Sequence, residues 1–535
     1  MPYKAYYLNF DLKNGNNNKL MLVHNFLQKS AERLPNKKAL ICNGTRLTFS
    51  EIEIYSNSLG NALKAAGLQT LDRVAIYLEN SVEAVISIFG ILKAGGIFTI
   101  INPQTKAKRL QYILNDCQVK FLITDINLLP NYSVEHPHLH LILATLDKPD
   151  LEKQILEKFI KISSFWELIK QSPNSCLYNP CSTTDLCSII YTSGSTSNPK
   201  GVMLTHLNML SAANSIIEYL ENTSDDIIIN VLPLSFDYGL YNILMPFYFG
   251  GTVVLEKSFI SPYQLIGLVK KEKVTGLPIV PTIVALMLKF NLEKYDFSSI
   301  RYITNTGQAL PSRHISRLTE LFPQAKIYSM YGLTECKRVS YLPPNELLKR
   351  PNSVGKAMPN VEVYLVKEDG SKINQPGEIG ELVVQGANVM KGYWNLPEET
   401  AKVLKQDFKT DKKVLYTGDI FKMDEDMYLY FVGRKDDLIK TSGERVSPKE
   451  IENVLYELKG INEVAVYSVE DEILGQAIKV SLVLEKNSIL TKEDILEYCS
   501  KHLEKLMMPK YVEIMQELPK TINGKINKKL LKQVK

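Results

Sequence analysis

Cysteine is scarce in this chain and is not spaced to bind metal. The seven cysteines are an odd number, and none lies in a C-x-x-C pair. Disulfide frameworks use even sets of cysteine in secreted chains, and structural zinc sites use closely spaced pairs. We therefore expect reduced thiols and no cysteine-based metal centre.

An excess of charge of one sign is absent, and so are long apolar runs. Lysine and arginine number 63 and aspartate and glutamate 58, a net charge of +5 over 535 residues. The N-terminal segment has no apolar signal core, and the most membrane-like window, residues 84–101, is interrupted by Lys93. A buried helix, a turn and a buried strand explain that window better than a membrane span. We expect a cytoplasmic protein without nucleic-acid or membrane partners.

The length corresponds to about three or four structural units at roughly 150 residues each. Helical spacing over 50–66 is followed by an apolar strand over 73–78, and this alternation continues to about residue 430. Such alternation predicts parallel sheets covered by helices. From Val361 strands and turns dominate, and the residues after Gly433 form a compact α+β stretch.

The strongest local signal is IIYTSGSTSNPKGVMLTH at residues 189–206. An apolar strand runs into a loop of small and polar residues that ends near Lys200. Backbone N–H groups and hydroxyls of such a loop can wrap a polyphosphate, with the lysine as a point charge. The pattern is not G-x-x-x-x-G-K-[ST], so it is not a P-loop NTPase motif. The alternative interpretation is a polar surface loop.

TSGSTSNPKG resembles the phosphate loop of the adenylate-forming superfamily, which comprises acyl-CoA synthetases, amino-acid adenylation domains and luciferases. The likeness extends from RLTFSEI at Arg46 to NGKINKK near the end, with further motifs in family order. It implies an α/β fold with a large N-terminal domain of layered sheets, a small β subdomain and a mobile α+β C-terminal domain. The implied boundaries are 1–433 for the N-terminal domain, about 361–433 for its β-rich subdomain, 434–436 for a hinge and 437–535 for the mobile domain.

YGLTE at residues 331–335 matches the family's Y-G-x-T-E motif. An aromatic ring can stack on adenine, a hydroxyl can bind a phosphate oxygen, and a carboxylate is a natural Mg²⁺ ligand. The resemblance therefore implies an adenine platform at Tyr331, a phosphate contact at Thr334 and a magnesium ligand at Glu335. Taken alone, YGLTE is also compatible with an ordinary turn.

Other motifs complete the nucleotide site that the resemblance implies. NTGQALP at 305–311 would pass against adenine, and the carboxylate of Asp419 would accept both ribose hydroxyls. Arg434 would be a second nucleotide contact; alone it would be a surface charge of little energetic value. The implied nucleotide-binding residues are Thr192, Ser193, Gly194, Ser195, Thr196, Gly307, Gln308, Ala309, Tyr331, Gly332, Asp419 and Arg434.

The C-terminal motifs imply a domain that moves between two half-reactions. Asp436 matches the hinge position, and Gly443 in TSGERVSPKE would line the channel of the incoming thiol. Ser447 and Pro448 also look like an ordinary helix start, and both interpretations can hold. Lys525 in PKTINGK would bridge the substrate carboxylate and the α-phosphate.

The implied reaction joins ATP·Mg²⁺ and a carboxylic acid into an acyl-adenylate with release of pyrophosphate. Catalysis of this kind depends on positioning and on neutralising charge at phosphorus. The catalytic residues are then Lys525, Thr334, Glu335 and Lys200, and the cofactors are ATP and Mg²⁺. A nucleotide-binding protein without catalysis is disfavoured because all five charged motif residues are present: Lys200, Glu335, Asp419, Arg434 and Lys525.

The segment VLPLSFDYG at 231–239 bears on the substrate. Phe236 stands where many acyl-CoA synthetases carry His. Asp237 matches the aspartate of the F-D-x-S motif, which holds an amino acid's ammonium group in adenylation domains, but Gly239 departs from the Ser. The alternative is that Asp237 caps the following helix. The predicted acyl pocket comprises Asp237 and, beside it, apolar and bulky residues that favour a compact substrate: Tyr238, Tyr241, Pro278, Thr306 and Met330.

The run TECKRVSYLPP at 334–344 resembles stand-alone ligases that load amino acids, notably proline, onto carrier proteins. No carrier-protein segment follows Lys535, so the thiol is expected on another molecule. The favoured function is transfer of a small amino acid such as L-proline to a phosphopantetheinylated carrier protein. The alternative is an acyl- or aryl-CoA ligase that uses coenzyme A.

Overall fold

The computed structural model describes residues 21–131, 139–145, 161–192, 198–257, 261–407, 412–441, 444–471, 475–521 and 526–533. Ser193, Gly194, Ser195, Thr196, Gly443 and Lys525 lie outside these ranges.

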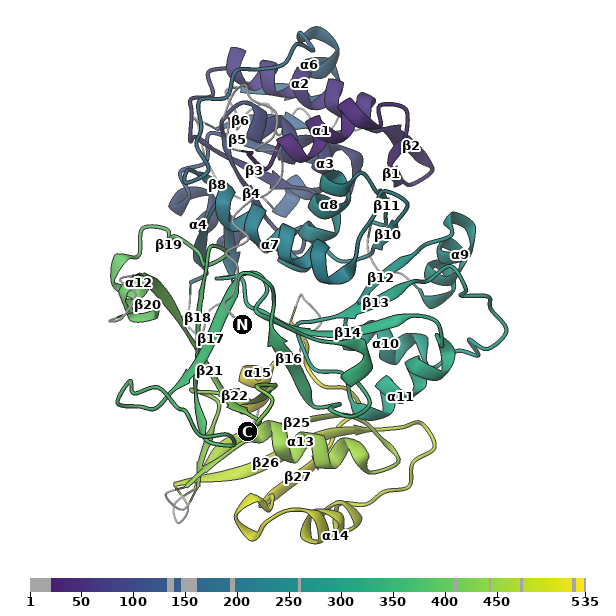
Figure 1. Cartoon of the computed structure of the whole chain (residues 1–535), viewed down its shortest axis with the longest axis vertical. Coiled ribbons are helices and arrows are strands. Elements are labelled where there is room, and N and C mark those ends of the chain that lie inside the picture. Colours follow the sequence, from purple (N-terminus) through teal and green to yellow (C-terminus); the bar gives the residue numbers. More distant parts are fainter. Residues whose placement is uncertain are drawn as a thin grey trace, which may run out of the picture.

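An eight-stranded sheet forms the upper part of the molecule, in the order β19-β9-β8-β4-β3-β5-β6-β7 (Figure 1). Its strands are β3 (Arg73–Tyr77), β4 (Ile97–Ile100), β5 (Phe121–Thr124), β6 (His140–Leu143), β7 (Lys161–Ser164), β8 (Leu186–Thr192), β9 (Lys200–Thr205) and β19 (Gly392–Tyr393). The strands from β8 to β7 are parallel, and β9 returns antiparallel to β8. This is the layered α/β pattern that the sequence predicts.

A larger, fourteen-stranded sheet runs in the order β17-β18-β21-β22-β16-β15-β14-β13-β12-β10-β11-β1-β2, with β20 beside β21. Its strands are β1 (Lys38–Cys42), β2 (Thr45–Thr48), β10 (Ile227–Asn230), β11 (Thr252–Leu255), β12 (Gly276–Ile279), β13 (Tyr302–Asn305), β14 (Lys326–Tyr331), β15 (Ser340–Leu342), β16 (Ser353–Ala357), β17 (Val361–Val366), β18 (Ile379–Gly386), β20 (Leu404–Gln406), β21 (Lys413–Met423) and β22 (Leu429–Arg434). Because β16 pairs with both β15 and β22, the β-rich stretch continues the sheet that carries the parallel strands.

Helices cover both sheets. They are α1 (Asn25–Arg33), α2 (Phe49–Ala65), α3 (Val82–Lys93), α4 (Ala107–Asp116), α6 (Phe165–Gln171), α7 (His206–Leu220), α8 (Asp237–Phe249), α9 (Pro262–Glu272), α10 (Pro281–Met287), α11 (Ser312–Leu321) and α12 (Pro397–Val403). Helix α2 begins with a capping box in which Thr48 and Glu51 satisfy each other's backbone N–H groups. Figure 1 shows α7 and α8 between the upper sheet and strands β10–β12, where one hydrophobic core joins both sheets.

The apolar window at 84–101 is a buried helix, a turn and a buried strand, as predicted. Helix α3 is buried almost all round, Gly95 turns the chain with φ of 76°, and β4 is buried along its length. No helix among the described residues is long and apolar enough to cross a membrane. The apolar run therefore serves the core between the sheets.

The C-terminal residues build a separate five-stranded sheet with its own core. Its elements are β23 (Ile439–Thr441), β24 (Glu444–Val446), α13 (Pro448–Glu457), β25 (Ile461–Asp471), β26 (Gly475–Leu484), α14 (Lys492–His502), β27 (Tyr511–Ile514) and α15 (Lys528–Gln533). One contact to the rest of the chain is an ion pair of 3.1 Å between Arg313 on α11 and Glu485. Figure 1 shows this unit below the large sheet.

Candidate active site

The described ends of the predicted phosphate loop belong to strands β8 and β9. Thr192 and Lys200 face each other as the last register pair of these strands. The Lys200 ammonium lies 2.6 Å from Glu399 Oε2 on α12 and 5.2 Å from the ring centre of Tyr393. The hydrogen bond from Lys200 lowers the pKa of Glu399 to about 2. Helix α12 therefore holds the lysine that sequence analysis assigns to phosphate.

Glu335 lies on the other side of Tyr393. The Tyr393 hydroxyl donates to Glu335 Oε1 at 2.9 Å, and the backbone N–H of Met390 donates to the Glu335 carbonyl at 2.7 Å. Strand β19, which carries Tyr393, pairs with β9, the strand that begins at Lys200. The candidate magnesium ligand and the candidate phosphate lysine are thus joined through one tyrosine ring.

Tyr331, Asp419 and Arg434 form a second cluster from three separate motifs. The Tyr331 hydroxyl donates to Asp419 Oδ2 at 2.5 Å, and Arg434 Nε lies 3.0 Å from Asp419 Oδ1. Asp419 and Arg434 are direct register partners on β21 and β22. The Asp419 carboxylate raises the pKa of Arg434, and burial together with Asp419 raises the pKa of Tyr331. The buried Asp419 carboxylate, within β21, thus has two partners that each lie at the end of another strand.

The turn after Tyr331 folds back on itself. A Cβ added at Gly332 would lie 2.3 Å from the Lys337 carbonyl oxygen, so only glycine fits there. The Asn388 amide holds the same turn by donating to the carbonyls of Cys336 and Arg338 at 2.7 and 3.0 Å. Thr334 is half-buried within this turn. The close packing of this turn thus explains why the second position of the Y-G-x-T-E motif is a glycine in this chain.

The predicted adenine loop follows β13. The Asn305 amide donates to the Gln308 carbonyl at 2.9 Å, and Gly307 has φ of 87°. Gly307, Gln308 and Ala309 are exposed. Strands β13 and β14 are parallel neighbours, so this loop and Tyr331 lie at the same edge of the sheet. The carboxyl ends of parallel strands are where ligands bind in α/β sheets.

The predicted hinge residue Asp436 is exposed in the turn between β22 and β23. The Asp437 backbone N–H closes that turn on the Arg434 carbonyl at 2.9 Å. Helix α13 begins as predicted, with the Ser447 side chain accepting from the Glu450 N–H and Pro448 at the first position. The Ser447 hydroxyl also donates to the Val432 carbonyl, which ties the two domains together beside the turn.

On the acyl side, the proposal that Asp237 caps a helix is wrong. Helix α8 already includes Asp237 in its first turn, and the N-cap residue is Phe236, which makes no side-chain cap bond. Gly239 packs so closely that an added Cβ would lie 2.3 Å from the Pro233 carbonyl oxygen. The serine of the F-D-x-S motif therefore has no room in this chain.

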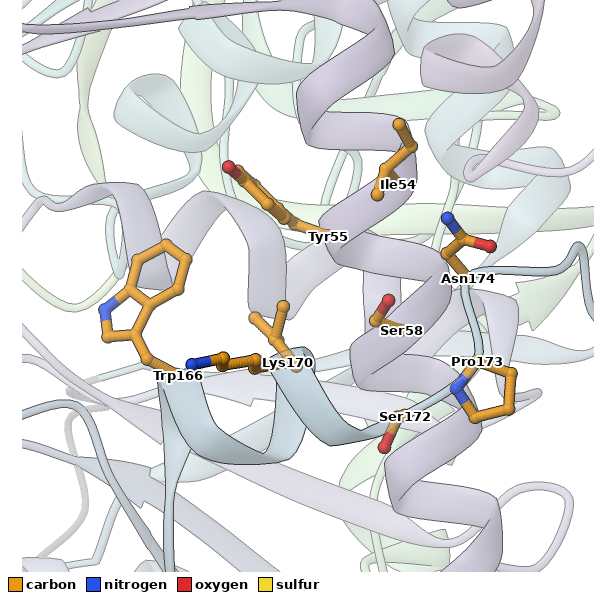
Figure 2. Close-up of a pocket in the computed structure, with 9 residues that line it drawn as sticks. Ile54, Tyr55, Ser58, Trp166, Lys170, Ser172, Pro173 and Asn174 are labelled. Carbon is orange, nitrogen blue, oxygen red and sulfur yellow. The ribbon is translucent and has the colours of Figure 1, made fainter.

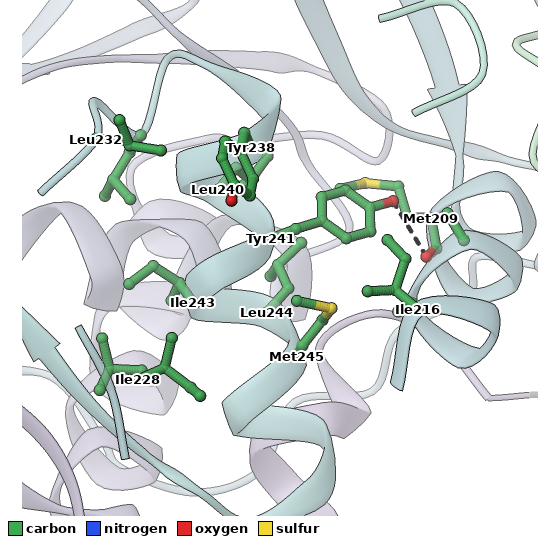
Figure 3. Packing of buried hydrophobic residues seen from close by; sticks show 14 of the residues in the cluster. Met209, Ile216, Ile228, Leu232, Tyr238, Leu240, Tyr241, Ile243, Leu244 and Met245 are labelled. Atoms are coloured by element: carbon green, nitrogen blue, oxygen red, sulfur yellow. Dashed lines mark hydrogen bonds between the residues drawn. The ribbon is translucent and has the colours of Figure 1, made fainter. Parts of the chain in front are cut away.

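The other predicted pocket residues lie together on α8 and on the ends of neighbouring strands. Tyr238 and Tyr241 are buried on α8; their hydroxyls donate to the Thr304 carbonyl at 2.8 Å and the Met209 carbonyl at 3.2 Å, the latter drawn in Figure 3. Three more are buried on or beside adjacent strands of the large sheet: Pro278 on β12, Thr306 after β13 and Met330 on β14.

This pocket is not apolar as the sequence predicts, because two basic residues reach into it. The Lys337 ammonium lies 5.2 Å from the ring centre of Tyr241, and the Arg338 guanidinium 5.4 Å from that of Tyr238. Both side chains are buried, 2% and 5% exposed. Burial lowers the pKa of Lys337 to about 8, although the Asp237 carboxylate raises it. In the sequence, the basic pair directly after YGLTEC was the feature that could have predicted these charges in the pocket.

A separate surface pocket of about 620 Å³ lies between α2 and α6, lined by Tyr55, Trp166 and Lys170 among others (Figure 2). None of the predicted site residues lines it. In Figure 1 these two helices lie at the far end of the molecule from the C-terminal unit. The pocket is therefore not part of the candidate active site.

Comparison with known proteins agrees with this geometry. The AMP-binding enzyme family model matches residues 27–394, and the model of the AMP-binding enzyme C-terminal domain matches residues 450–525. The chain therefore belongs to the AMP-binding enzyme family. It is an AMP-forming ligase of the adenylate-forming superfamily.

Relatives of two kinds resemble the chain. The long-chain-fatty-acid–CoA ligase of Bacillus subtilis is 32% identical over 95% of this chain and 94% of its own length. Gramicidin S synthase 2 of Brevibacillus brevis is 29% identical over 95% of this chain, but only 11% of that protein is matched. The CoA ligase corresponds to the alternative interpretation of the sequence, and Gramicidin S synthase 2 to the favoured one.

Solved structures show the same fold over nearly the whole chain. ATP-bound MatB from Rhodopseudomonas palustris superposes with a TM-score of 0.84 at 26% identity, covering 96% of this chain and 99% of that one. The anthranilate CoA ligase AuaEII in complex with anthranoyl-AMP gives 0.85 at 27% identity, covering 96% and 97%. The family and the ATP-bound neighbour support ATP as the nucleotide.

Proposed function

We propose that this protein is an acid–thiol ligase that activates a carboxylic acid as its adenylate and transfers the acyl group to coenzyme A. The observation that carries this choice is the buried Lys337 ammonium, which lies over the ring of Tyr241 and whose charged form the Asp237 carboxylate favours. A buried carboxylate beside an apolar pocket needs a cationic partner, which the ammonium of an amino-acid substrate would provide. The chain itself supplies a cation, so an amino group on the substrate is not required.

Two further observations support the coenzyme A ligase over the amino-acid ligase. Gly239 leaves no room for the serine of the amino-acid motif. The fatty-acid–CoA ligase relative is matched along nearly its whole length, whereas the peptide synthetase is matched over a small part. We do not extend the long acyl chain in that relative's name to this protein, because the buried Arg338 places a charge in the predicted pocket.

The described residues fit a magnesium ion at Glu335. The carboxylate is half-buried, its described hydrogen bond uses Oε1, and no group of three or more potential metal ligands occurs among the described residues. Magnesium usually takes one or two carboxylates together with substrate phosphates, so a single carboxylate is appropriate. When bound there, the ion would neutralise charge on the phosphates of ATP.

The residues of the chain have separate parts in the proposed reaction. Asp419 holds the ribose, Tyr331 supports the adenine, and Lys200 binds a phosphate oxygen once it leaves Glu399. One carboxylate oxygen of the acid attacks the α-phosphorus, and the bond to pyrophosphate breaks. Lys525 balances the charge in that step. The thiol sulfur then forms the thioester bond, and AMP leaves with the electron pair of the broken C–O bond.

The test combines substrate and acceptor. ATP–pyrophosphate exchange is measured with fatty, aromatic and amino acids, and thioester formation with coenzyme A or a phosphopantetheinylated carrier protein. We expect exchange with non-amino acids and thioester formation with coenzyme A. Exchange only with amino acids, or transfer only to the carrier protein, would contradict the proposal.

Substitution of Asp237 tests the same point from the protein side. For the proposed function, Asp237→Asn should change exchange with the best non-amino acid by only a few-fold. If an amino acid such as L-proline were the substrate, loss of the ammonium partner would cost about 2–3 kcal/mol, a fall of roughly 30- to 150-fold in kcat/KM. Asp225→Asn, at an exposed position before β10, is the matched control.

The amino-acid and carrier-protein function remains the second candidate. Asp237 is half-buried in the first turn of α8, the place at which the resemblance puts an ammonium ligand. A wild-type preference for L-proline over cyclopentanecarboxylic acid, its carbocyclic analogue, would favour this candidate.

A further inference from the structure

Arg338 is buried with its charge incompletely matched. Its Nη1 donates to the Thr306 hydroxyl at 2.6 Å, and its Nε has no hydrogen-bond partner among the described residues. A hydroxyl can accept a hydrogen bond but cannot neutralise a guanidinium. Leaving a buried charge uncompensated costs several kcal/mol, so such charges are normally paired.

The guanidinium is held in one place by its surroundings. It lies over the ring of Tyr238, whose hydroxyl is fixed by both the carbonyl and the hydroxyl of Thr304. The Arg338 carbonyl is anchored by the Asn388 amide. The arginine is therefore pre-organised, which is what a recognition site for a planar anion requires.

A second cation extends this positive region. The Lys337 ammonium is buried over Tyr241 and has no hydrogen-bond partner among the described residues. Asp237 is the acidic side chain of the predicted pocket that acts on Lys337. Among the described residues of the predicted pocket, two cations thus face one carboxylate, which leaves one positive charge to be balanced.

The position of Arg338 in the site indicates which group could neutralise its positive charge. Arg338 follows Glu335 by three residues, and its partner Thr306 directly precedes the adenine loop at Gly307. Its other neighbour, Tyr238, lies in the first turn of α8. The guanidinium thus lies between the nucleotide residues and α8, where the proposed function puts the acyl group.

We propose that the acid activated by this enzyme carries a second carboxylate, which Arg338 binds as a bidentate ion pair, with Lys337 adding to the positive potential. This inference rests on the proposed function and specifies its substrate class: short dicarboxylic acids, aliphatic or aromatic. One carboxylate reacts with ATP, and the other stays ionised against the arginine.

The experiment uses matched pairs of acids that differ by one carboxylate. ATP–pyrophosphate exchange is measured for succinate against butyrate, glutarate against valerate, and phthalate against benzoate. We expect the dicarboxylate of at least one pair to have a kcat/KM at least about tenfold higher, as for a desolvated charge pair. Equal or better use of every monocarboxylate would overturn the inference.

Substitutions distinguish a role of Arg338 in substrate recognition from a purely structural role. Arg338→Gln should abolish the preference by raising KM for the dicarboxylate, while KM for ATP and use of the monocarboxylate stay within about twofold. Arg317→Gln, at a partly exposed position on α11, is the matched control and should leave the preference unchanged. A preference retained in Arg338→Gln would overturn the inference. If that variant does not fold, Arg338→Lys, which lacks the bidentate fork, should show a reduced preference, and an unchanged one overturns the inference.

A binding measurement keeps this inference distinct from the proposed function. If no acid of any class supports exchange with the wild-type protein, the proposed function fails. Calorimetric titration of succinate, glutarate and phthalate into wild-type protein and Arg338→Gln then decides the inference alone. Binding that is lost in the variant supports it, and absence of binding, or equal binding to both, overturns it.

Discussion

The nucleotide side and the acyl side of this site differ in whether their charged side chains have partners within the chain. On the nucleotide side, Asp419 is paired with Arg434, and Lys200 with Glu399. On the acyl side, Lys337 Nζ and Arg338 Nε are buried with no hydrogen-bond partner among the described residues. Paired charges keep a site folded until ATP arrives, whereas unpaired buried charges are costly and indicate a ligand group that completes them.

The difference follows from what each side must recognise. ATP is the same in every member of such a family, so its contacts recur as motifs that a sequence reveals. The acid varies, so its contacts lie in ordinary-looking residues next to the motifs. Variants of each side should therefore fail differently: nucleotide-side variants with every acid, and acyl-side variants with particular acids.

Lys525→Ala should have the largest effect. Loss of its ammonium should lower adenylate formation by about 10²–10³-fold with every acid, because it would neutralise charge only in the transition state. ATP binding and thioester formation from a synthetic acyl-adenylate should persist, and rapid-quench assays of each half-reaction measure this. Lys532→Ala, at an exposed position on α15, is the control. Adenylation at near wild-type rate would remove Lys525 from the mechanism.

Asp419→Asn should have the next largest effect on activity. The amide leaves Arg434 without its counter-charge and binds a ribose diol more weakly, at about 2–3 kcal/mol, so kcat/KM for ATP should fall roughly 30- to 150-fold. The loss should be the same for every acid. Asp369→Asn, in an exposed turn, is the matched control. An unchanged KM for ATP, or a loss confined to one acid, would contradict the division between the two sides.

Glu399→Gln should have a small effect of opposite sign. Lys200 must leave Glu399 to contact a phosphate, and a partly exposed ion pair of this kind contributes little to stability. KM for ATP should therefore fall by up to about fivefold, as initial-rate kinetics would show. Glu398→Gln, at the exposed neighbouring position, should leave it unchanged. A rise in KM would mean that Glu399 positions Lys200 rather than competes for it.

His206→Asn should change stability rather than activity. Burial lowers the pKa of His206 to about 4 from 6.5, and its Nδ1 accepts the Val23 N–H at 3.2 Å. As pH falls from about 6.5 to 4, the unfolded chain binds the proton first, so wild-type stability should decline by about 3 kcal/mol over that window.

Asparagine keeps an acceptor but does not titrate, so the decline with pH should be shallower in that variant. Urea unfolding at several pH values measures the slope, with His502→Asn as the exposed control. Equal slopes in His206→Asn and wild type would show that another group causes the decline.

Local sequence predicted the elements that frame the site. The strand before the phosphate loop, the helix start at Ser447 and the buried helix α3 all appear where periodicity and capping residues indicated. A cap at Asp237 would start α8 one residue too late: aspartate is a preferred N-cap residue, but Asp237 is already helical here, and Gly239 packs against the Pro233 carbonyl. Short-range rules cannot detect such packing.

The sequence by itself determined the superfamily, the fold class and the order of the motifs, since these depend on local patterns and on residues fixed by a constant ligand. Only the tertiary structure decided which charges meet. Asp419 and Arg434 become partners through strand pairing, Lys200 meets Glu399 about two hundred residues along the chain, and Arg338 reaches Tyr238 across the sheet. Whether a charge is neutralised or left for a substrate depends on those long-range contacts.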